Sequence, residues 1–180
     1  MIQNPNFLGA STSIVTERLF GSQPTNDDFK NFRTIDSNLN VQRTLFGKTY
    51  TPDESRRRLE KFMKHWADHR FGEWMFRLAD GTFVGTGGLF YDVIDDEEVV
   101  ALGYVIDEPY WGQGFATEIA RASMRVAFDE LQVAVAYGVI EPDNIPSRRV
   151  LEKSGFSYVK DFLYHGEWPS ALLRATSPSN

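Results

Sequence analysis

A single segment in the second half of the chain constrains the fold more than any other. It begins with the apolar run Val99–Ile106, which is typical of a buried strand, and continues into a loop that contains Gly112 and Gly114. An amphipathic helix is expected next, from about Thr117 to Leu131, and then a second buried strand at 133–140. This order predicts that the loop comes close to a ligand, because glycine has no Cβ and the N–H groups at a helix start lack partners.

Patterns on either side of this segment place it in a larger sheet. Thr51 and Glu54 have the spacing of a capping box, with Pro52 in the first turn, so a helix is expected to begin there. Asp80-Gly81 is a strong hairpin signal between two strands. The other expected elements are strands at 14–20, 73–79, 82–91, 156–164 and 171–175, and helices over about 24–32 and 144–155. The chain is therefore predicted to be an α+β (mixed α/β) domain, with a central mixed, mostly antiparallel sheet flanked by helices.

Composition and charge exclude several classes of protein. The 180 residues suit one domain, 1–180, with flexible ends at 1–12 and 177–180. No apolar run reaches the length of a membrane span, and the N-terminus lacks the pattern of a secretory signal. The net charge of −6 argues against nucleic-acid binding, and the absence of cysteine excludes a catalytic thiol and thiolate metal sites. A cytoplasmic protein with no nucleic-acid or membrane partner is expected.

The loop with Gly112 and Gly114 fits a phosphate group. N–H groups from about Gln113 to Thr117, together with the positive end of the helix dipole, suit a pyrophosphate without any charged side chain. A dinucleotide fingerprint is an alternative, but Thr117 stands where its third glycine belongs, and Glu141 lies further along than its ribose-binding acid should. A tight turn that binds nothing is the other alternative.

Two longer stretches carry a resemblance to a known family. LGYVIDEPYWGQGFATEIA stands at 102–120 and EPDNIPSRRVLEKSGF at 141–156, and Thr16-Glu17-Arg18-Leu19 adds to them near the start. Together they resemble the GNAT superfamily of acyl-CoA-dependent N-acetyltransferases, and within it the RimJ/RimL-like group, which includes ribosomal-protein N-terminal acetyltransferases. The resemblance covers most of the chain. It implies the GNAT fold and acetyl-CoA as the acyl donor.

The resemblance also assigns cofactor-binding residues. The family's phosphate loop reads Arg/Gln-x-x-Gly-x-Gly/Ala, and here Trp111, Gly114 and Ala116 take the three positions, so Trp111 departs from the general pattern. Val105 and Ile106 would pair with the pantetheine arm, where the family splays two central strands. Arginine and lysine side chains of the second motif are candidates for the cofactor's 3′-phosphate, with an exposed basic helix face as the alternative: Arg148, Arg149 and Lys153. The full predicted set is Val105, Ile106, Trp111, Gly112, Gln113, Gly114, Phe115, Ala116, Thr117, Asn144, Ser147 and Arg148.

Candidates for catalysis follow from the second motif. Many GNAT enzymes carry a tyrosine at the position of Leu151, whereas RimJ/RimL-like members show Asn-x-x-Ser, which Asn144 and Ser147 match. By this resemblance Ser147 would meet the sulfur of the leaving group, and Asn144 would hold the cofactor arm. Capping of a helix start is the alternative for both residues, because both types are favoured there without any chemistry.

A base for the acceptor amine is harder to find. Relatives often carry a glutamate where Ala101 stands, and Glu97 shares the alternation of Ala101 along the strand, which makes it the candidate. Glu98, if the strand bulges, and a water relay to a more distant acid stay open, and both glutamates fit equally as solvated acids on a turn. His65 and His69 are spaced i,i+4, but no third ligand accompanies them, so no metal site is predicted.

These features predict an acyl-CoA-dependent N-acetyltransferase. It would transfer acetyl to a primary amine, either a protein N-terminus or a small molecule, by direct attack in a ternary complex. Trp66, Trp74, Phe90 and Tyr91 are candidates to line the acceptor pocket, with core packing as the alternative. A catalytically inactive acetyl-CoA sensor and an interaction module without a ligand are the alternative functions. The protein would be a monomer, or a homodimer through its C-terminal strands.

Overall fold

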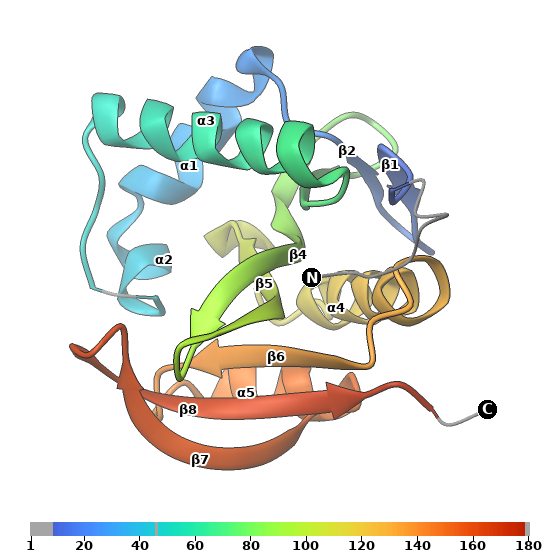
Figure 1. Ribbon diagram of the computed structural model, residues 1–180. Helices are drawn as coiled ribbons and strands as arrows, with labels where there is room; N and C mark the ends of the chain where they lie inside the picture. Colours follow the sequence, from blue (N-terminus) through green and yellow to red (C-terminus); the bar gives the residue numbers. More distant parts are fainter. Residues whose placement is uncertain (1–8, 46, 179–180) are drawn as a thin grey trace.

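One eight-stranded sheet runs through the computed structural model, which describes residues 9–45 and 47–178 (Figure 1). The strands lie in the order β1-β2-β3-β4-β5-β6-β8-β7. β5 and β6 are parallel neighbours, and every other neighbouring pair is antiparallel. The prediction of a mixed, mostly antiparallel sheet is therefore confirmed. The strands are β1 (Ser13–Val15), β2 (Phe20–Ser22), β3 (Glu73–Arg77), β4 (Phe83–Ile94), β5 (Glu97–Ile106), β6 (Val135–Ile140), β7 (Ser157–Tyr164) and β8 (Trp168–Thr176).

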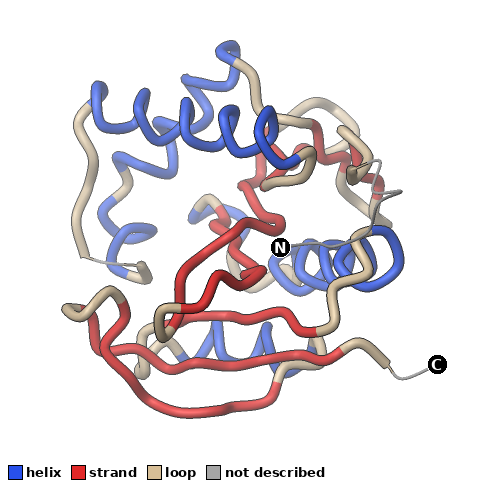
Figure 2. The backbone as a smooth tube through the Cα atoms, viewed as in Figure 1, coloured by secondary structure: helices blue, strands red, loops and turns tan. Residues whose placement is uncertain are grey.

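Helices flank this sheet, as Figure 2 shows. The α-helices are α1 (Phe29–Ser37), α2 (Leu39–Arg43), α3 (Pro52–His69), α4 (Phe115–Arg125) and α5 (Ile145–Lys153). Three short helices complete the chain: η1 (Asn26–Asp28) and η2 (Glu108–Tyr110), which are 3-10 helices, and the π-helix η3 (Val126–Glu130). None of the described helices is both long and apolar enough to cross a membrane.

Two hydrophobic clusters hold the helices against opposite faces of the sheet. One cluster joins α1, α2 and α3 to β3 and β4, and includes Leu59 and Met75. The other lies under α4 and α5 and includes Trp74 and Ile119, together with Trp66 from the last turns of α3. Trp74 and Met75 separate in this way because successive side chains of a strand point to opposite faces. Trp66 and Trp74 are fully buried, so core packing, and not the lining of a pocket, is confirmed for both.

The structure corrects the predicted bounds of several elements: β4 extends to Ile94, β8 starts at Trp168, and α1 runs to Ser37. The strand predicted at 14–20 is a hairpin, β1 and β2, whose turn is closed by a hydrogen bond from Thr16 N–H to the Leu19 carbonyl (2.9 Å). The helix predicted from Thr117 begins at Phe115, and its last turn widens to a π-helix. The short helix α2 was not predicted, because its five residues are too few to show a helical period.

The turns behave as their local sequence predicts. Gly81 has a φ of +86° in the β3–β4 turn, and the two residues between β4 and β5, Asp95 and Asp96, have φ values of 53° and 64°. Such left-handed pairs match the twist of a hairpin.

The predicted flexible ends lie mostly outside the described residues. In the part of the N-terminal end that the structure describes, the Ala10 N–H donates to the Arg70 carbonyl at 2.9 Å.

Candidate active site

The sheet opens between β5 and β6. The two strands are paired for only two residues each, ending at Ala101 and Tyr137. Beyond these residues β5 continues to Ile106 without pairing with β6, although it stays paired with β4 over its whole length. The glycine loop follows β5 and the Asn-x-x-Ser motif follows β6. The opening therefore brings both sequence motifs to the two sides of one gap.

Backbone donors of β5 face this gap. The Asp107 N–H, just after β5, donates to the Val84 carbonyl of β4 at 2.8 Å. Because N–H groups alternate in direction along an antiparallel strand, those of Tyr104 and Ile106 point away from β4. Of the two residues predicted to meet the pantetheine arm, Ile106 has this direction, whereas the Val105 N–H points toward β4. An extended, amide-containing chain could pair with this edge as an added strand does.

The glycine loop forms a cradle at the start of α4. Gly114 is the N-cap of the helix with a φ of +84°, and Gly112 has a φ of +72°, a conformation that only glycine adopts without strain. Within the described residues, the first-turn N–H groups of Phe115, Ala116 and Thr117 have no hydrogen-bond partner. A Cβ on Gly112 would meet nothing within 4 Å. An anion could therefore approach these donors closely.

Thr16 and Arg18 of the N-terminal hairpin bind Gln113 and Glu118 of the cradle, and these contacts are called the clamp below. Arg18 donates from Nη1 to the Gln113 carbonyl (2.9 Å) and from Nε to Glu118 Oε2 (2.7 Å), and its guanidinium lies 4.2 Å from the centre of the Phe115 ring. Glu118 also accepts hydrogen bonds from the Arg18 N–H and the Thr16 hydroxyl. Burial raises the pKa of Glu118, but these bonds outweigh it and lower the pKa overall. The loop is thus held by residues about a hundred positions away, including Thr16 and Arg18 of the Thr16–Leu19 motif.

Trp111 fastens the loop to the end of β5. Its indole N–H donates to the Ile106 carbonyl at 2.7 Å, while the ring is 41% exposed. Gln113 makes a second local bond, from Nε2 to the Pro109 carbonyl at 3.1 Å. Trp111 stands where the family pattern has arginine or glutamine, and its contact is with the protein's own backbone.

Asn144 and Ser147 are both engaged in the gap. Asn144 Oδ1 accepts from the Ser147 N–H at 3.0 Å, so the capping role is observed, and its Nδ2 donates to the Thr44 carbonyl beside α2 at 2.8 Å. Ser147 Oγ lies 2.8 Å from the hydroxyl of Tyr104. The roles of Asn144 and Ser147 toward a cofactor stay predictions.

Tyr104 is a candidate that sequence reasoning missed. The expected tyrosine position holds Leu151, which is fully buried in the core. Tyr104 instead brings its hydroxyl from β5 across the gap to the start of α5, where it also lies 3.2 Å from the Ser147 carbonyl. Burial raises the pKa of Tyr104 to about 12, so the group stays protonated and can donate a proton. The signal was present in the Leu-Gly-Tyr motif, but the contact to α5 is tertiary.

The basic residues of α5 differ in their surroundings. Arg149 and Lys153 are exposed. Arg148 is half-buried and lies over the Tyr158 ring at 5.5 Å, and its Nε is a buried donor without a hydrogen-bond partner in the described part of the chain. A buried donor of this kind suits an anion, since leaving it unpaired costs free energy. Arg148 therefore fits the predicted cofactor contact better than its two neighbours.

The carboxylates predicted as bases lie away from the gap. Glu97 is exposed and is the first residue of β5, paired with Ile94 beside the turn, and Glu98 follows it. A different carboxylate, Glu73 of β3, lies over the gap segment of β5: its Oε1 is 3.4 Å from where a Cβ on Gly103 would stand. Burial raises the pKa of Glu73 to about 8, although the nearby charge of Arg58 opposes the shift. Sequence reasoning missed Glu73, because only the sheet order brings it to β5.

Both histidine candidates on α3 are engaged in local contacts. His65 Nε2 accepts from the Tyr91 N–H at 3.0 Å, and Nδ1 lies 2.8 Å from the Phe71 carbonyl. Burial lowers the pKa of His65. His65, His69, Phe71 and Tyr91 form one aromatic cluster, so Tyr91 is packed there. No group of three or more metal-binding side chains is found among residues 9–45 and 47–178.

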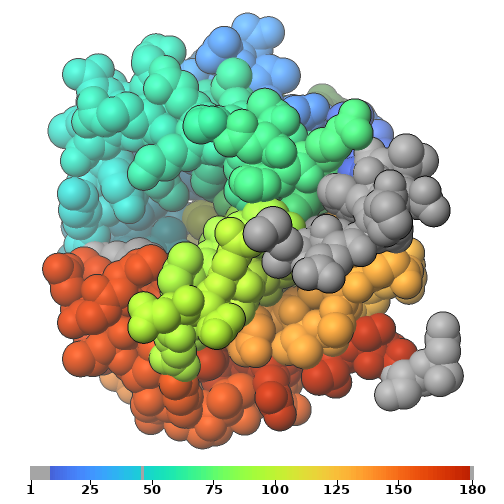
Figure 3. Space-filling model, viewed as in Figure 1, coloured from blue at the N-terminus to red at the C-terminus, as the bar shows by residue number. Residues whose placement is uncertain are grey.

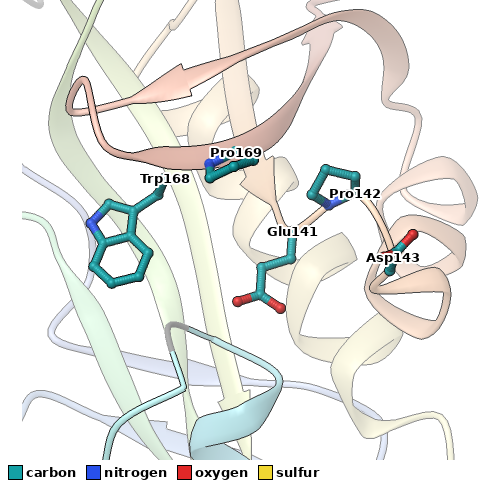
Figure 4. A pocket seen from close by; sticks show the side chains of 5 residues that line it. All are labelled: Glu141, Pro142, Asp143, Trp168 and Pro169. Carbon is teal, nitrogen blue, oxygen red and sulfur yellow. The ribbon is translucent and has the colours of Figure 1, made fainter.

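An acidic and aromatic pocket lies at the end of β6. It is an open pocket of ≈ 240 Å³, and Figure 4 shows its lining: Glu141, Pro142, Asp143, Trp168 and Pro169. Burial, and then the charge of Asp143, raise the pKa of Glu141. On the viewed face in Figure 3, the C-terminal hairpin lies below the α2 segment at the left of the molecule. Carboxylates beside an indole suit a cationic group.

Comparison with known proteins identifies the family. A family model described as an acetyltransferase (GNAT) domain matches residues 18–157. The chain is 31% identical over 110 residues to the probable N-acetyltransferase YjcK of Bacillus subtilis (strain 168), which is 59% of this chain and 60% of that protein. It is 30% identical over 137 residues to FsC-acetyl coenzyme A-N(2)-transacetylase of Aspergillus fumigatus, which is 72% of this chain and 57% of that protein.

Solved structures agree with this result. The structure of an acetyltransferase from Agrobacterium tumefaciens str. C58 superposes with a TM-score of 0.81 at 21% identity, over 97% of this chain and 99% of that one. The chain spans about half to three fifths of the length of the curated relatives it matches. The protein belongs to the GNAT acetyltransferase family and has its fold.

Proposed function

We propose that this protein is an N-acetyltransferase that transfers acetyl from acetyl-CoA to a primary amine by direct attack in a ternary complex. The observation that carries the proposal is the cradle at Gly112 and Gly114, which opens beside the gap between β5 and β6. A pyrophosphate would accept from the N–H groups at the start of α4, and Ile106 and Tyr104 would pair with the pantetheine arm. The orphaned Arg148 Nε supports an anion nearby.

The leaving group would take its proton from Tyr104, in place of Ser147, the candidate that the resemblance implies. The Tyr104 hydroxyl lies 2.8 Å from Ser147 Oγ at the start of α5, and it is protonated at neutral pH; burial raises its pKa further, to about 12. Polarisation of the acetyl carbonyl would come from a backbone N–H of β5 that points into the gap. An inactive sensor would fit the absence of a tyrosine at Leu151, whereas the hydroxyl of Tyr104 beside Ser147 supports catalysis.

The acceptor and the subgroup are finer parts of the same proposal. The pocket of Glu141, Asp143 and Trp168 supports a cationic amine, which suits both a small polyamine and a protein N-terminus. Membership of the RimJ/RimL-like group and a cytoplasmic location stay predictions. A monomer or a homodimer through the C-terminal strands is also still a prediction, and the position of β7 at an edge of the sheet is compatible with a homodimer.

Isothermal titration of acetyl-CoA tests the cradle. Gly114→Trp puts a large side chain where the pyrophosphate would lie, and we expect micromolar binding to the wild-type protein and no binding to this variant. Gly81→Trp is the matched control, because Gly81 has a φ of +86° against +84° for Gly114; a Cβ at Gly81 would meet nothing within 4 Å, and one at Gly114 would meet only Arg18 Nη2, at 3.5 Å. If the wild-type protein does not bind acetyl-CoA, or if both variants bind equally, the cradle is only a turn. A panel of spermidine, kanamycin and a peptide with a free N-terminal alanine then tests for CoA release.

A further inference from the structure

A carboxylate over the gap segment of β5 has no assigned role in acetyl transfer. We propose that Glu73 is the general base that takes the proton from the acceptor amine. This inference rests on the proposed function, and it replaces Glu97 as the candidate for that step. It stands on the position of Glu73 across three strands of the sheet.

Glycines at positions 88 and 103 leave the space through which the Glu73 side chain extends over β5. Glu73 pairs with Gly88 of β4, and Gly88 pairs with Gly103 of β5, so the three residues form one row across the sheet. A Cβ on Gly88 would lie 2.6 Å from Glu73 Cα, and a Cβ on Gly103 would lie 3.4 Å from Glu73 Oε1. A side chain at either position would block the row. The carboxylate thus lies over β5, two residues beyond Ala101, where pairing with β6 ends.

The two faces of this part of β5 carry complementary groups. Tyr104 points toward α5, where Ser147 holds its hydroxyl. Gly103, the preceding residue, faces the side of α1–α3, because side chains alternate along a strand. The Phe90 ring also lies on that side, 2.9 Å from where a Cβ on Gly103 would stand. A proton donor on one face and a carboxylate on the other flank the position at which the acyl group would lie.

The surroundings of Glu73 do not fit a structural ion pair. In the described part of the chain its carboxylate makes no hydrogen bond or ion pair. The charge that acts on the pKa of Glu73 is Arg58 of α3. The Arg58 guanidinium is already paired with the fully buried Asp36 of α1. Burying a carboxylate without a partner costs free energy. A base needs this state, because a raised pKa brings the group close to the working pH.

The step then balances in a simple way. The amine nitrogen forms a bond to the acetyl carbonyl carbon while the carbon–sulfur bond breaks. The proton that the nitrogen loses goes to the Glu73 carboxylate, and the thiolate of CoA takes up a proton from Tyr104 to become the thiol. Glu73 and Tyr104 afterwards exchange protons with water, so no oxidant or further reactant is required.

Glu73→Gln is the main test, with acetyl-CoA and the panel amine that gives the highest kcat/KM. We expect kcat to fall about 100- to 1000-fold, with the Kd for acetyl-CoA unchanged within threefold. The rise of kcat/KM with pH near 8 should disappear, leaving only the titration of the amine itself. Glu73→Asp keeps the charge but shortens the reach by one methylene, and it should lose at least tenfold. Glu60→Gln, an exposed change on α3, is the matched control.

The outcomes separate the two proposals. If the wild-type protein binds no acetyl-CoA and releases no CoA with any panel amine, the proposed function fails, and the base proposal falls with it. If the wild-type protein turns over while Glu73→Gln keeps its rate and its pH profile, only the base proposal is overturned. Loss of the same pH limb in Glu97→Gln, and not in Glu73→Gln, would give the role to Glu97. If Glu73→Gln fails to fold, Glu73→Asp decides by the same measurements.

Discussion

Two partly buried glutamates in this protein have opposite surroundings. Glu118 of α4 accepts hydrogen bonds from Thr16 and Arg18 and is ion-paired with the Arg18 guanidinium at 2.7 Å. Glu73 of β3 has no such partner among the described residues, and its pKa is raised by burial whereas that of Glu118 is lowered. The first carboxylate is arranged to hold a loop in shape. The second is left in a costly state at the gap in the sheet, which is the arrangement expected of a group that exchanges protons.

The largest effect is expected for the unfolding free energy of a variant at Glu118. Glu118→Gln should lower the free energy of unfolding by about 2–4 kcal/mol, because Thr16 and Arg18 lose a charged acceptor that is only 13% exposed. Urea denaturation at pH 7 measures the loss. Glu60→Gln, which is exposed on α3, should stay within about 0.5 kcal/mol of the wild-type protein. Equal values for the two variants would mean that the clamp adds nothing to stability.

A second effect concerns the hydroxyl on the other face of β5. Tyr104→Phe should lower kcat by about 10- to 100-fold and leave the Kd for acetyl-CoA unchanged, because the leaving thiolate loses its proton donor. Tyr164→Phe is a suitable control, since it also removes a hydrogen-bonded hydroxyl, one that donates to Asp92 at 2.7 Å. Turnover by both variants is measured from CoA release. A Tyr104→Phe enzyme with wild-type kcat would remove Tyr104 from the mechanism.

The pH dependence of stability separates the two glutamates further. Burial raises the folded-state pKa of Glu73 to about 8, above the ordinary value of 4.5, so its contribution to stability is present below pH 4.5 and is lost as the pH rises to 8. Between pH 5 and 9 the wild-type protein should therefore lose about 1–2 kcal/mol more free energy of unfolding than Glu73→Gln, after allowance for solvent screening. The Tm of Glu73→Gln should accordingly fall less over this range. Thermal unfolding across this range measures the difference.

Glu118 should show the opposite trend. Its lowered pKa means that its contribution is present above the unfolded value of 4.5 and is lost as the pH falls through the folded value. The wild-type protein should therefore lose stability relative to Glu118→Gln below pH 4.5. Parallel pH profiles for the Glu73 and Glu118 variants would show that the two carboxylates do not differ in the way described.

The smallest effect is expected for the cation of the clamp. Arg18→Met should weaken acetyl-CoA binding by about three- to tenfold, because a positive charge beside the cradle is lost and the Gln113 carbonyl loses a donor. The difference between this variant and the wild-type protein should shrink at high salt, since salt screens the attraction of a half-exposed cation for phosphate. Isothermal titration at 50 mM and 500 mM salt, concentrations chosen for the contrast in Debye length, provides the test. A salt-independent difference would assign the loss to loop shape.

Local sequence was sufficient for much of the fold. Asp80-Gly81 predicted a hairpin, Thr51 and Glu54 a capping box, and the apolar run at β5 a buried strand, and all three are present. Each of these signals acts between residues a few positions apart, where the period of a helix or the geometry of a turn decides. The element bounds were less accurate at the N-terminal hairpin, because its turn depends on Glu118 from α4.

The candidate active site also has some features that local sequence predicts and others that it does not. The sequence by itself determined the cradle: Gly112 and Gly114 before a helix, and Asn144 as a cap, are local features that need no knowledge of the fold. Only the tertiary structure decided which groups meet in the gap. Tyr104 reaches Ser147 because β5 and β6 separate, and Glu73 reaches Gly103 because β4 lies between them and carries a glycine in the same row. Strand order and register arise from packing of the whole core, so contacts across them cannot be derived from spacing along the chain.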